Sequence, residues 1–583
     1  MNPIQLPIGS YVEAALVLAL VAPVAMALLG ATSPLRRCMP WMAIFGALPA
    51  LFCALTVPIG TTLELPWLLL ESRFAIDATG KHFLLFTALL WLFSAVFAAG
   101  YMAGDEKRFR FFFGFLLAMG GNFGLILAMD MVSFLVAFAL MSFASYSLVV
   151  HSQDADAVRS GRVYISLVVI GEIILFSALI LHAGTGGDVN LQSLKGTLST
   201  PTVAVLLLIG FGIKAGAILL HVWLPLAHTV APTPASAVLS GSMIKAGLIG
   251  WIRFLPPGAE GAAAWGAVFL AAGIIAAFYG VAVGLGQNHP KTVLAYSSIS
   301  QMGLITVAFG IWLTLGNEAP AAAACVLLYA FHHALAKGAL FLGVGVVGGM
   351  KPQSKRRGLV TAALVIAALA LAGGPLTTGA MAKIALKNVV VHLPANWEGT
   401  LVLLLPLSAI GTAVLMGRFF YTLRTYTAHH RVSKIEFLSL IALLMLSTTA
   451  LFLVPGNRPA ANAMLKPSSV WLSFWPAAVG IGLTTSVWFW SRRTGRGIPW
   501  RIPAGDLLLP VEWLFGVVSH LALALKGKAV ELFKANEKKE KAYNDQGEPK
   551  RIETWETYLS RWNTSSLIFV GIVCALLFFL SRP

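Results

Sequence analysis

The 583-residue chain has few of the residues that build metal centres and soluble catalytic sites. Only 11% of its residues are charged, against about 25% in an average globular protein. Its cysteines, which could form disulfides or bind metal, are the scattered Cys38, Cys53, Cys325 and Cys574. No CxxC pair, cysteine/histidine ligand spacing, Walker loop or dinucleotide fingerprint following a strand occurs. We therefore expect no metal, no cofactor and no catalytic residues on this chain, and a redox cofactor would belong to another subunit.

Long apolar runs take the place of these features, since 58% of the residues are hydrophobic. A helix needs about 20 apolar residues to span a bilayer. We predict about sixteen spans near residues 11–30, 39–58, 82–103, 111–129, 131–151, 163–183, 202–224, 235–254, 262–287, 290–314, 318–349, 359–393, 399–425, 436–456, 470–491 and 564–581. The runs lack the alternation of a membrane barrel, so the expected fold is an all-α polytopic membrane protein. No basic residues precede the first run, which predicts a helix that stays in the mature protein rather than a cleaved signal peptide.

The net charge of +17 reports membrane topology rather than a nucleic-acid partner. With these spans, most lysines and arginines between them share one side of the membrane: Arg36, Arg37, Lys107, Arg108, Arg110, Arg159, Arg162, Lys291, Lys351, Lys355, Arg356, Arg357, Arg424, Arg431, Lys434, Arg492, Arg493 and Arg496. The opposite side has few: Arg73, Lys81, Lys195, Arg253, Arg458 and Lys466. The positive-inside rule places the basic side in the cytoplasm. We expect a multi-pass protein of a bacterial-type inner membrane with both termini on the outer, periplasmic side.

Basic side chains also lie inside the spans, most densely in GFGIKAGAILLHVWLPLAHTVAPTPASAVLSGSMIKAG, residues 210–247. This segment holds Lys214, His221, His228 and Lys245. A charged residue at the centre of a bilayer costs roughly 3 to more than 10 kcal/mol, so such residues are typical of ion or proton pathways. His221 follows Lys214 by seven residues, which predicts about 10 Å of separation along one helix face. We expect the helix to be broken at Pro225 and at the PTP of residues 232–234.

The twelfth span repeats this pattern in LALAGGPLTTGAMAKIALK, where Gly373, Gly374 and Pro375 precede Lys383 and Lys387. Broken spans in corresponding halves indicate a midplane ion site in transporters built from repeats. The alternative is a proline kink with lysines that snorkel to the membrane surface.

A histidine–lysine cluster lies in the eleventh span, in FHHALAKGALFL. His333 and Lys337 are four residues apart and so share a helix face, with His332 beside them. Histidine can exchange a proton near neutral pH, although a single histidine in a bundle is more often a core residue. The hydroxyls of AYSSISQMG, residues 295–303, could hold water or simply allow tight helix packing.

In this order, residues 210–247 and the motifs AYSSISQMG, FHHALAKGALFLGVG and GGPLTTGAMAK resemble the antiporter-like subunits of respiratory complex I, Mrp antiporters and group 4 hydrogenases such as formate hydrogenlyase. The resemblance covers roughly residues 70–430. It implies two inverted five-helix repeats, spans four to eight and nine to thirteen, each with a broken helix. It also implies proton transfer by Lys214, Lys245, His333, Lys337 and Lys383.

One position departs from the family pattern. The family has a glutamate in a fifth-span motif like WELMSLSSYLLV, where this chain has FALMSFASYSLV with Ala139 in its place. The resemblance implies that this glutamate pairs with the seventh-span lysine, here Lys214. Glu172 in the sixth span is a candidate replacement, and the alternative is a structural or intersubunit contact for Glu172.

The remaining segments complete the expected organisation. It consists of helices 1–3 in residues 1–110, repeats in 111–254 and 262–425, helices 14 and 15 in 436–491, an amphipathic surface helix in 505–545 and an anchor helix in 564–581. The helix at 505–545 resembles, weakly, the lateral helix of the distal complex I subunit.

These features predict a proton-translocating subunit of a complex I-like assembly, of the group 4 hydrogenase or NADH:quinone oxidoreductase type. The proton-transfer candidates are Lys214, His221, His228, Lys245, His333, Lys337, Lys383, Glu172, His332 and Lys387. The chain would not be an enzyme alone, and its partners would be the bilayer and other subunits. The alternatives are a secondary transporter subunit, either of an Mrp-type Na⁺/H⁺ antiporter or of an inorganic-carbon uptake complex, and a scaffold that has lost conduction with Ala139.

Overall fold

The computed structural model describes residues 8–69, 71–184, 187–188, 190–191, 200–316, 319–428, 430–494 and 502–508. It divides into one unit of residues 1–504 and a second of residues 505–583. The expected surface helix at 505–545, apart from its first residues, and the expected anchor at 564–581 lie outside the described residues. The first unit contains all the candidate site residues.

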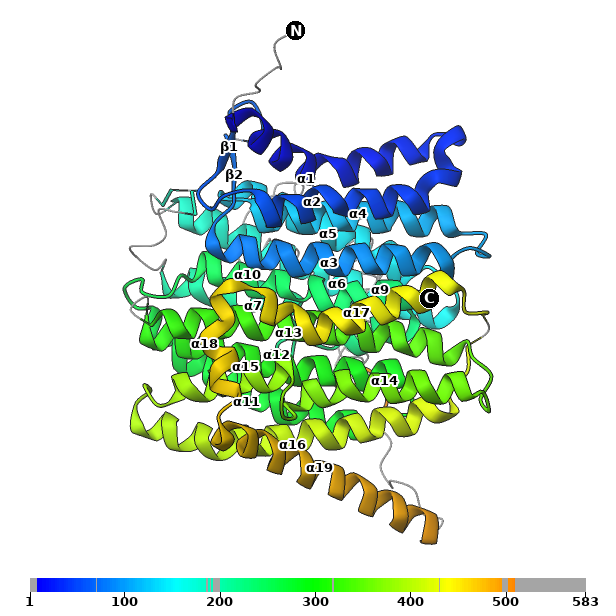
Figure 1. Ribbon diagram of the computed structural model, residues 1–583. Helices are drawn as coiled ribbons and strands as arrows, with labels where there is room; N and C mark the ends of the chain where they lie inside the picture. The colour runs from blue at the N-terminus through cyan, green and yellow to red at the C-terminus, as the bar shows by residue number, and fades with distance from the viewer. Residues whose placement is uncertain are drawn as a thin grey trace, which may run out of the picture. The chain divides into compact units, whose positions relative to one another are not determined.

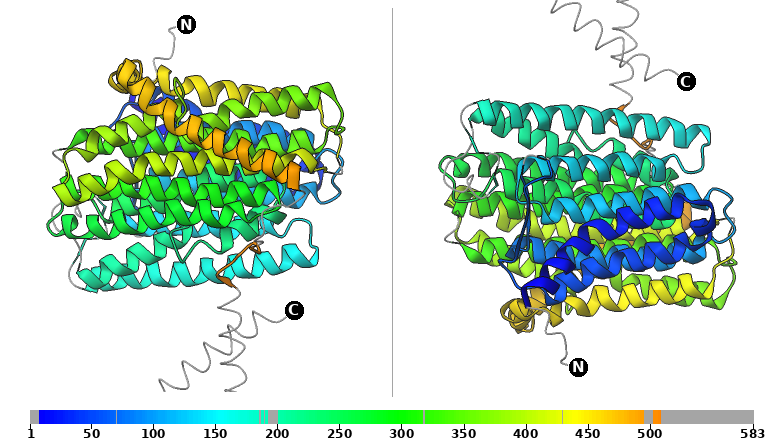
Figure 2. Two further views of the ribbon diagram at one scale, coloured as in Figure 1. Left: turned by 90° about the horizontal axis from the view of Figure 1, so that it is seen from below. Right: turned by 90° about the horizontal axis from the view of Figure 1, so that it is seen from above.

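The first unit is a bundle of helices that run side by side in the views of Figures 1 and 2. The elements in chain order are α1 (Ile8–Ala31), η1 (Ser33–Cys38), α2 (Met39–Thr56), β1 (Thr62–Leu65), β2 (Ser72–Ala75), α3 (Ala78–Tyr101), α4 (Arg108–Leu127), α5 (Met131–Val149), α6 (Ala155–Gly184), α7 (Pro201–Ala215), α8 (Trp223–Val230), α9 (Thr233–Val238), η3 (Leu239–Met243), α10 (Lys245–Phe254), α11 (Ala262–Leu285), α12 (Pro290–Leu315), α13 (Pro320–Gly348), α14 (Lys355–Ala372), α15 (Thr378–Val390), α16 (Ala395–Thr425), α17 (Lys434–Leu453), η4 (Pro455–Asn457), α18 (Arg458–Met464) and α19 (Pro467–Thr494). The strands form one antiparallel hairpin in which Thr62 pairs with Ala75.

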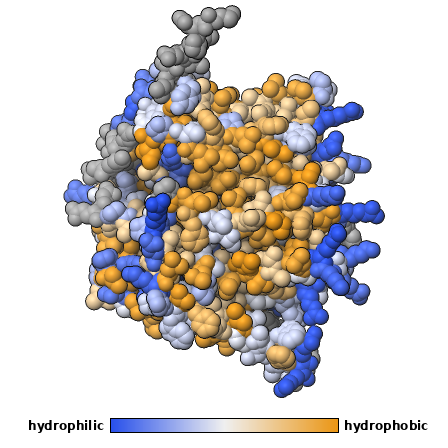
Figure 3. Space-filling model, viewed as in Figure 1, coloured by the Kyte–Doolittle hydropathy of each residue, from blue (hydrophilic) through white to orange (hydrophobic). Residues whose placement is uncertain are grey.

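Within the described residues, 13 helices are long and apolar enough to cross a membrane. An apolar band covers the middle of the surface in Figure 3, between two hydrophilic edges. Polar side chains start several helices: Asp77 accepts from the Gly80 amide, Asp130 accepts from the Ser133 amide, and Ser433 forms a capping box with Glu436. The all-α polytopic fold expected from the apolar runs is thereby confirmed. The eleventh span, α13, is one continuous helix.

Two spans are broken, as predicted, and their breaks share one backbone pattern. The first separates α7 from α8 and has positive φ at Gly216 (67°) and Leu219 (70°). The second separates α14 from α15 and has positive φ at Gly373 (79°) and Leu376 (60°). In each break a left-handed glycine ends the first half-helix, which is a common C-terminal cap, and a left-handed leucine follows three residues later.

The position of the first break corrects two predictions. Pro225 lies within the first turn of α8, where proline needs no amide hydrogen bond, and the chain has already left the helix at Gly216. His221 therefore does not share a helix face with Lys214, because it lies in the connection between the half-helices. The PTP segment does separate two helices, since α8 ends at Val230 and α9 begins at Thr233.

The two broken spans run in opposite directions. The ends of α3, α5, α8 and α16 and the start of α12 line one pocket, so these ends share one face of the bundle. Arg357, near the start of α14, donates to the carbonyl oxygens of Leu423 and Tyr426 at that same face. Span α14–α15 therefore starts at this face, whereas span α7–α8 ends there. We call it the basic face, since Arg36, Lys107 and Lys291 also lie at it.

Small residues bring the central helices close together. A Cβ on Gly273 of α11 would lie 2.6 Å from the Gly303 carbonyl oxygen of α12. The reciprocal Cβ on Gly303 would lie 2.5 Å from the Gly273 carbonyl oxygen. Such contacts allow helix backbones to touch inside a membrane, where lipid offers no hydrophobic driving force for helix association. The tight core holds the polar side chains described next at fixed positions.

Candidate functional site

Lys214 lies at the end of the half-helix α7 and is 3% exposed. Its Nζ donates to the Tyr164 hydroxyl at 3.1 Å, and that hydroxyl donates to the Ser142 carbonyl at 3.0 Å. The rings of Phe138, Tyr164 and Trp223 surround the Nζ at 6.0, 5.4 and 5.8 Å from their centroids. Aromatic faces and the negative end of a helix both favour a cation. The break in the span thus forms a cation site around this lysine.

Glu172 on α6 is the carboxylate whose charge acts on Lys214. Its Oε1 is buried and has no hydrogen-bond partner among the described residues. The two side chains interact through space, because no direct ion pair joins them in the described part of the chain. This geometry is compatible with Glu172 as the replacement for the carboxylate missing at Ala139, and it leaves room for the alternative of an intersubunit contact.

His221, within the first break, and His228, in α8, are both fully buried and have different surroundings. His221 contacts the rings of Tyr279 and Tyr296, with centroids 5.1 and 6.3 Å away. His228 stacks on Phe341 of α13 with centroids 4.6 Å apart, and neither of its nitrogens has a partner among the described residues. A ring with two unpaired nitrogens in a membrane core is a candidate for proton exchange rather than a fixed structural residue.

Lys245 and Lys337 are connected by a short polar network at the centre of the bundle. The π-helical turn η3 directs the Ser240 carbonyl to the Lys245 Nζ, 2.8 Å away. The Ser240 hydroxyl lies 2.7 Å from the Ser298 hydroxyl, which donates to the Leu294 carbonyl at 3.0 Å. Lys337 donates to the same carbonyl at 2.8 Å. Two buried lysines from the different helices α10 and α13 are thus connected through three hydrogen-bonding residues.

The π-helical turn is itself held by polar contacts. Ser242 donates to the Asn122 side-chain oxygen, which also accepts from Trp91 at 2.9 Å. π-Helical turns are rare and frequent at functional sites. These contacts fix the turn, and with it the carbonyl that Lys245 contacts.

His333 and His332 extend the network toward the second break. Both nitrogens of His333 lack partners among the described residues, and the charges of Lys245 and Lys337 act on its ring. The His332 Nδ1 lies 2.8 Å from the hydroxyl of Thr378, the first residue of α15. The expected grouping of His333 and Lys337 on one helix, with His332 adjacent, agrees with α13.

Lys383 occupies the second break much as Lys214 occupies the first. Its Nζ donates to the carbonyl of Ala372, the last residue of α14, at 2.9 Å. Lys383, in the second half-helix α15, thus contacts the C-terminal end of α14, whereas Lys214 lies in the last turn of the first half-helix α7 and donates to Tyr164. Lys387 lies one turn further on, in the last turn of α15, and is only partly buried.

Several residues of this site carry no clear sequence signal. Tyr164 is a single tyrosine in an apolar span, and Ser240 and Ser298 look like packing serines. Lys291 follows a proline at the start of a span, so the charge pattern predicts a lysine exposed on the cytoplasmic side. Its side chain is instead buried, with 5% exposure, and donates to the Ala231 carbonyl at 2.7 Å. Only their pairing across helices reveals them, and a single sequence does not show such pairs.

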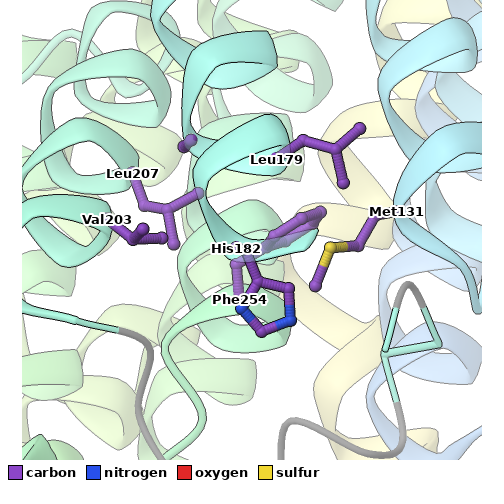
Figure 4. Close-up of a pocket in the computed structure, with 7 residues that line it drawn as sticks. Met131, Leu179, His182, Val203, Leu207 and Phe254 are labelled. Carbon is purple, nitrogen blue, oxygen red and sulfur yellow. The ribbon is translucent and has the colours of Figure 1, made fainter. Parts of the chain in front are cut away.

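A small notch beside His182 is not a candidate site. Figure 4 shows His182 beside Met131 and Phe254, with Leu179, Val203 and Leu207 around them. The notch has a volume of about 10 Å³, enough for one water at most, and apolar side chains form most of its wall. A His182 ring nitrogen lies 3.2 Å from the Asp188 carbonyl, so this histidine has a local structural role.

Comparison with known proteins identifies the same part of the chain. The sequence model of the family described as NADH:quinone oxidoreductase/Mrp antiporter, TM, matches residues 128–408. Hydrogenase-4 component B of Escherichia coli is 30% identical over 343 residues, covering 54% of this chain and 50% of that protein. A protein of Rhizobium meliloti named as part of a probable K⁺/H⁺ antiporter is 32% identical over 326 residues, covering 50% of this chain and 31% of that protein. The matches thus span about half or less of these relatives.

Solved structures share the fold. A chain of the Mrp complex from Dietzia sp. DQ12-45-1b superposes with a TM-score of 0.66 at 22% identity, covering 80% of this chain and 99% of that chain. A chain of the membrane-bound sulfane sulfur reductase, an archaeal respiratory membrane complex, gives a TM-score of 0.61 at 19% identity, covering 81% and 99%. The residues that the family model matches, 128–408, contain every candidate residue named above, and this part of the chain is similar to the transmembrane part of the NADH:quinone oxidoreductase/Mrp antiporter family.

Proposed function

We propose that this protein is the proton-translocating membrane subunit of a complex I-like assembly. The observation that carries the proposal is the network from Lys245 through Ser240, Ser298 and the Leu294 carbonyl to Lys337. Hydroxyls both donate and accept hydrogen bonds, and histidines and amines take up and release protons, so the side chains of this network can transfer a proton. The Ser240 and Leu294 carbonyls only accept hydrogen bonds, and they hold Lys245, Ser298 and Lys337 in position. An alternative role as packing residues does not require buried ammonium groups, which are costly in a membrane.

The breaks at either end of the network support the same function. Lys214 and Lys383 each lie at the C-terminal end of a half-helix, and the two spans enter from opposite faces. We propose that protons move between these ends along Lys214, Lys245, His333, Lys337 and Lys383, with His221, His228, His332, Glu172 and Lys387 as neighbouring exchange groups. The two spans would be the broken helices of inverted repeats in residues 111–254 and 262–425.

The partners of this subunit follow from its relatives. Those relatives include a hydrogenase-4 component, and the solved neighbours belong to respiratory and Mrp complexes. We propose that the chain works with a redox subunit that holds the cofactor, and that its basic face is cytoplasmic, which would place both termini outside. Electron transfer in the partner would change the charge near the lysines and move their protons.

Lys337→Met tests the proposal directly. Methionine has a similar length without the charge, so folding loses one hydrogen bond but no longer buries an ammonium. We expect proton uptake by vesicles containing the assembled complex to fall to background, with an unchanged melting temperature. The control Lys351→Met changes an exposed lysine in the connection between α13 and α14 and should leave uptake unchanged. Full uptake in Lys337→Met would refute proton transfer through this network.

Secondary transport of an alkali cation is the second candidate, because one relative is named as part of a K⁺/H⁺ antiporter and one solved neighbour belongs to an Mrp complex. The same vesicles distinguish the two functions. A proton movement that requires an imposed Na⁺ or K⁺ gradient supports exchange, whereas movement driven by the redox partner alone supports the primary proposal.

A further inference from the structure

A polar pocket of about 510 Å³ opens at the basic face, outside the lysine network. The end of α3 and the connection to α4 contribute Tyr101, Met102, Asp105, Glu106 and Lys107. The remaining lining residues come from the ends of α5, α8 and α16, the start of α9 and the start of α12: His151, Ser152, Thr229, Val230, Ala231, Pro232, Lys291 and Tyr426. We call it the Lys291 pocket. Its volume is enough for several water molecules.

The wall of the Lys291 pocket contains a histidine–carboxylate pair. The His151 Nε2 lies 2.9 Å from the Asp105 Oδ2, and the histidine side chain is only 5% exposed. The other ring nitrogen, Nδ1, is buried and has no partner among the described residues. The pKa of Asp105 is lowered, because hydrogen bonds from His151 and the Lys107 amide outweigh the larger single effect of burial, which raises it. The pair therefore has an ionised acceptor and an unused nitrogen in the wall of a pocket large enough for several water molecules.

The inner wall of the pocket leads toward the network. Lys291 donates to the Ala231 carbonyl, and the Thr229 hydroxyl lies 2.8 Å from that of Thr292. The next residue back along α8 from Thr229 is His228, on whose ring the charges of both Lys291 and Lys337 act. The unpaired His228 ring is thus within reach of the charge of Lys291 in the pocket and of the charge of Lys337 in the core.

The structure assigns the Lys291 pocket as the site where protons from the basic face enter the network, with His151 as the first group to take up a proton and His228 as the link to Lys337. This inference rests on the proposed function and names its uptake site.

The competing explanation is that His151 merely joins two loops. Its bond to Asp105 links the α3–α4 connection to the end of α5, and Lys107 adds a bond to the Ser152 carbonyl at 3.2 Å. The charged or titratable groups around the pocket are Tyr101, Asp105, Glu106, Lys107, Lys291 and Tyr426, of which Tyr426 has a pKa raised to about 12 by burial and by the nearby Tyr101. None of these groups forms a hydrogen bond with the buried Nδ1 of His151, and a purely structural link to Asp105 does not use this nitrogen.

The chain offers a matched control for the histidine. His430 lies 3.1 Å from the carboxylate of Glu436, as His151 does from Asp105, but it does not line the pocket. We would compare His151→Gln with His430→Gln in vesicles of the assembled complex. Glutamine keeps a hydrogen bond to the carboxylate but does not exchange protons near neutral pH.

Proton uptake should fall by about 10²-fold at about pH 8 in His151→Gln, because a positioned proton-exchange group is lost. The pH profile of uptake should also change, because glutamine cannot exchange a proton as an imidazole can. His430→Gln should keep both the rate and the pH profile, and the two variants should melt within the same range. Normal uptake and pH profile in His151→Gln, while Lys337→Met stays inactive, overturn the uptake site but not the proposed function. Equal losses in both glutamine variants, with lower melting temperatures, also overturn it.

A second measurement does not depend on His151. In full-length chain with Cys38 and Cys574 changed to serine, Thr229→Cys should react with a membrane-impermeant thiol reagent added at the basic face. Cys53 and Cys325 are buried and report the background. Labelling at the basic face and protection from the opposite face support the assignment, whereas protection from both faces shows that water does not reach the inner wall and overturns it.

Discussion

Ser298→Ala offers a sharp test of the lysine network, because the Ser298 hydroxyl connects α12 to the π-helical turn η3. It removes the contact of 2.7 Å to Ser240 and the bond of 3.0 Å to the Leu294 carbonyl, and it leaves the bonds of Lys245 and Lys337 to carbonyl oxygens in place. Ser300→Ala is the matched control. It lies on the same helix, is also buried, and its hydroxyl donates to the Ala277 carbonyl at 2.7 Å, away from the lysines.

The expected cost in stability is small and similar in the two variants. Each serine makes one contact to another helix, Ser298 to Ser240 and Ser300 to Ala277, and such bonds average about 0.6 kcal/mol in membrane proteins, so each variant should lose roughly that amount. The expected effects on proton movement differ strongly. Removal of a positioned proton-transfer group typically lowers a rate by about 10² or more, and only Ser298 occupies such a position.

The assay compares initial proton uptake in vesicles with the melting temperature of the same purified complex. We expect Ser298→Ala to lose about 10²-fold in uptake and Ser300→Ala to remain near the parent rate. Equal uptake in the two serine variants would show that protons do not pass between Ser240 and Ser298, and would remove the main support for a relay that joins the repeats.

Four further outcomes are expected. Glu172→Gln should lower proton uptake by removing the carboxylate that acts on Lys214, and adding Ala139→Glu should restore it; failure of the second change to rescue the first indicates that Glu172 has a different role. Lys214→Ala should likewise lower uptake, whereas undiminished uptake favours a first repeat that serves as scaffold. Gly273→Ala should destabilise the bundle by about 1–3 kcal/mol, because its Cβ meets α12 backbone, and Gly482→Ala, with open space around it, should change the melting temperature little. Asp154 accepts from the Ala157 amide, which lowers its pKa, so its contribution to stability is complete above the pKa of the unfolded aspartate, near 3.9, and is lost as the pH falls through the folded value; Asp154→Asn should remove this acid-side decline in thermal melts.

Sequence reasoning predicted the class of fold and most candidate groups, because both depend on one-dimensional signals. Apolar runs of span length are explicit in the chain, and a lysine within such a run, as at Lys214 or Lys337, is conspicuous because lipid makes it costly. The breaks were also predictable, since glycine and proline interrupt an apolar run near Gly373.

Details of the breaks and of the network were not predictable in this way. The first break begins at Gly216 rather than at Pro225, because proline is tolerated in the first turn of a helix and a left-handed glycine ends one. Ser240 and Ser298 are 58 residues apart in the chain and belong to different helical segments. Their contact depends on how these segments pack, which no local sequence pattern shows. The burial of Lys291 depends in the same way on a contact far along the chain, its bond to the Ala231 carbonyl in the connection between α8 and α9.

The opposed directions of the two broken spans bear on how the protein responds to membrane voltage. The half-helices that begin at Pro201 and Lys355 carry backbone dipoles that point in opposite senses across the bilayer. A transmembrane potential acts on one with the opposite sign to the other, so their contributions largely cancel. These two half-helices then contribute little net electrical work, and under the proposed function each elementary charge carried across would account for about 2.3 kcal/mol for each 100 mV.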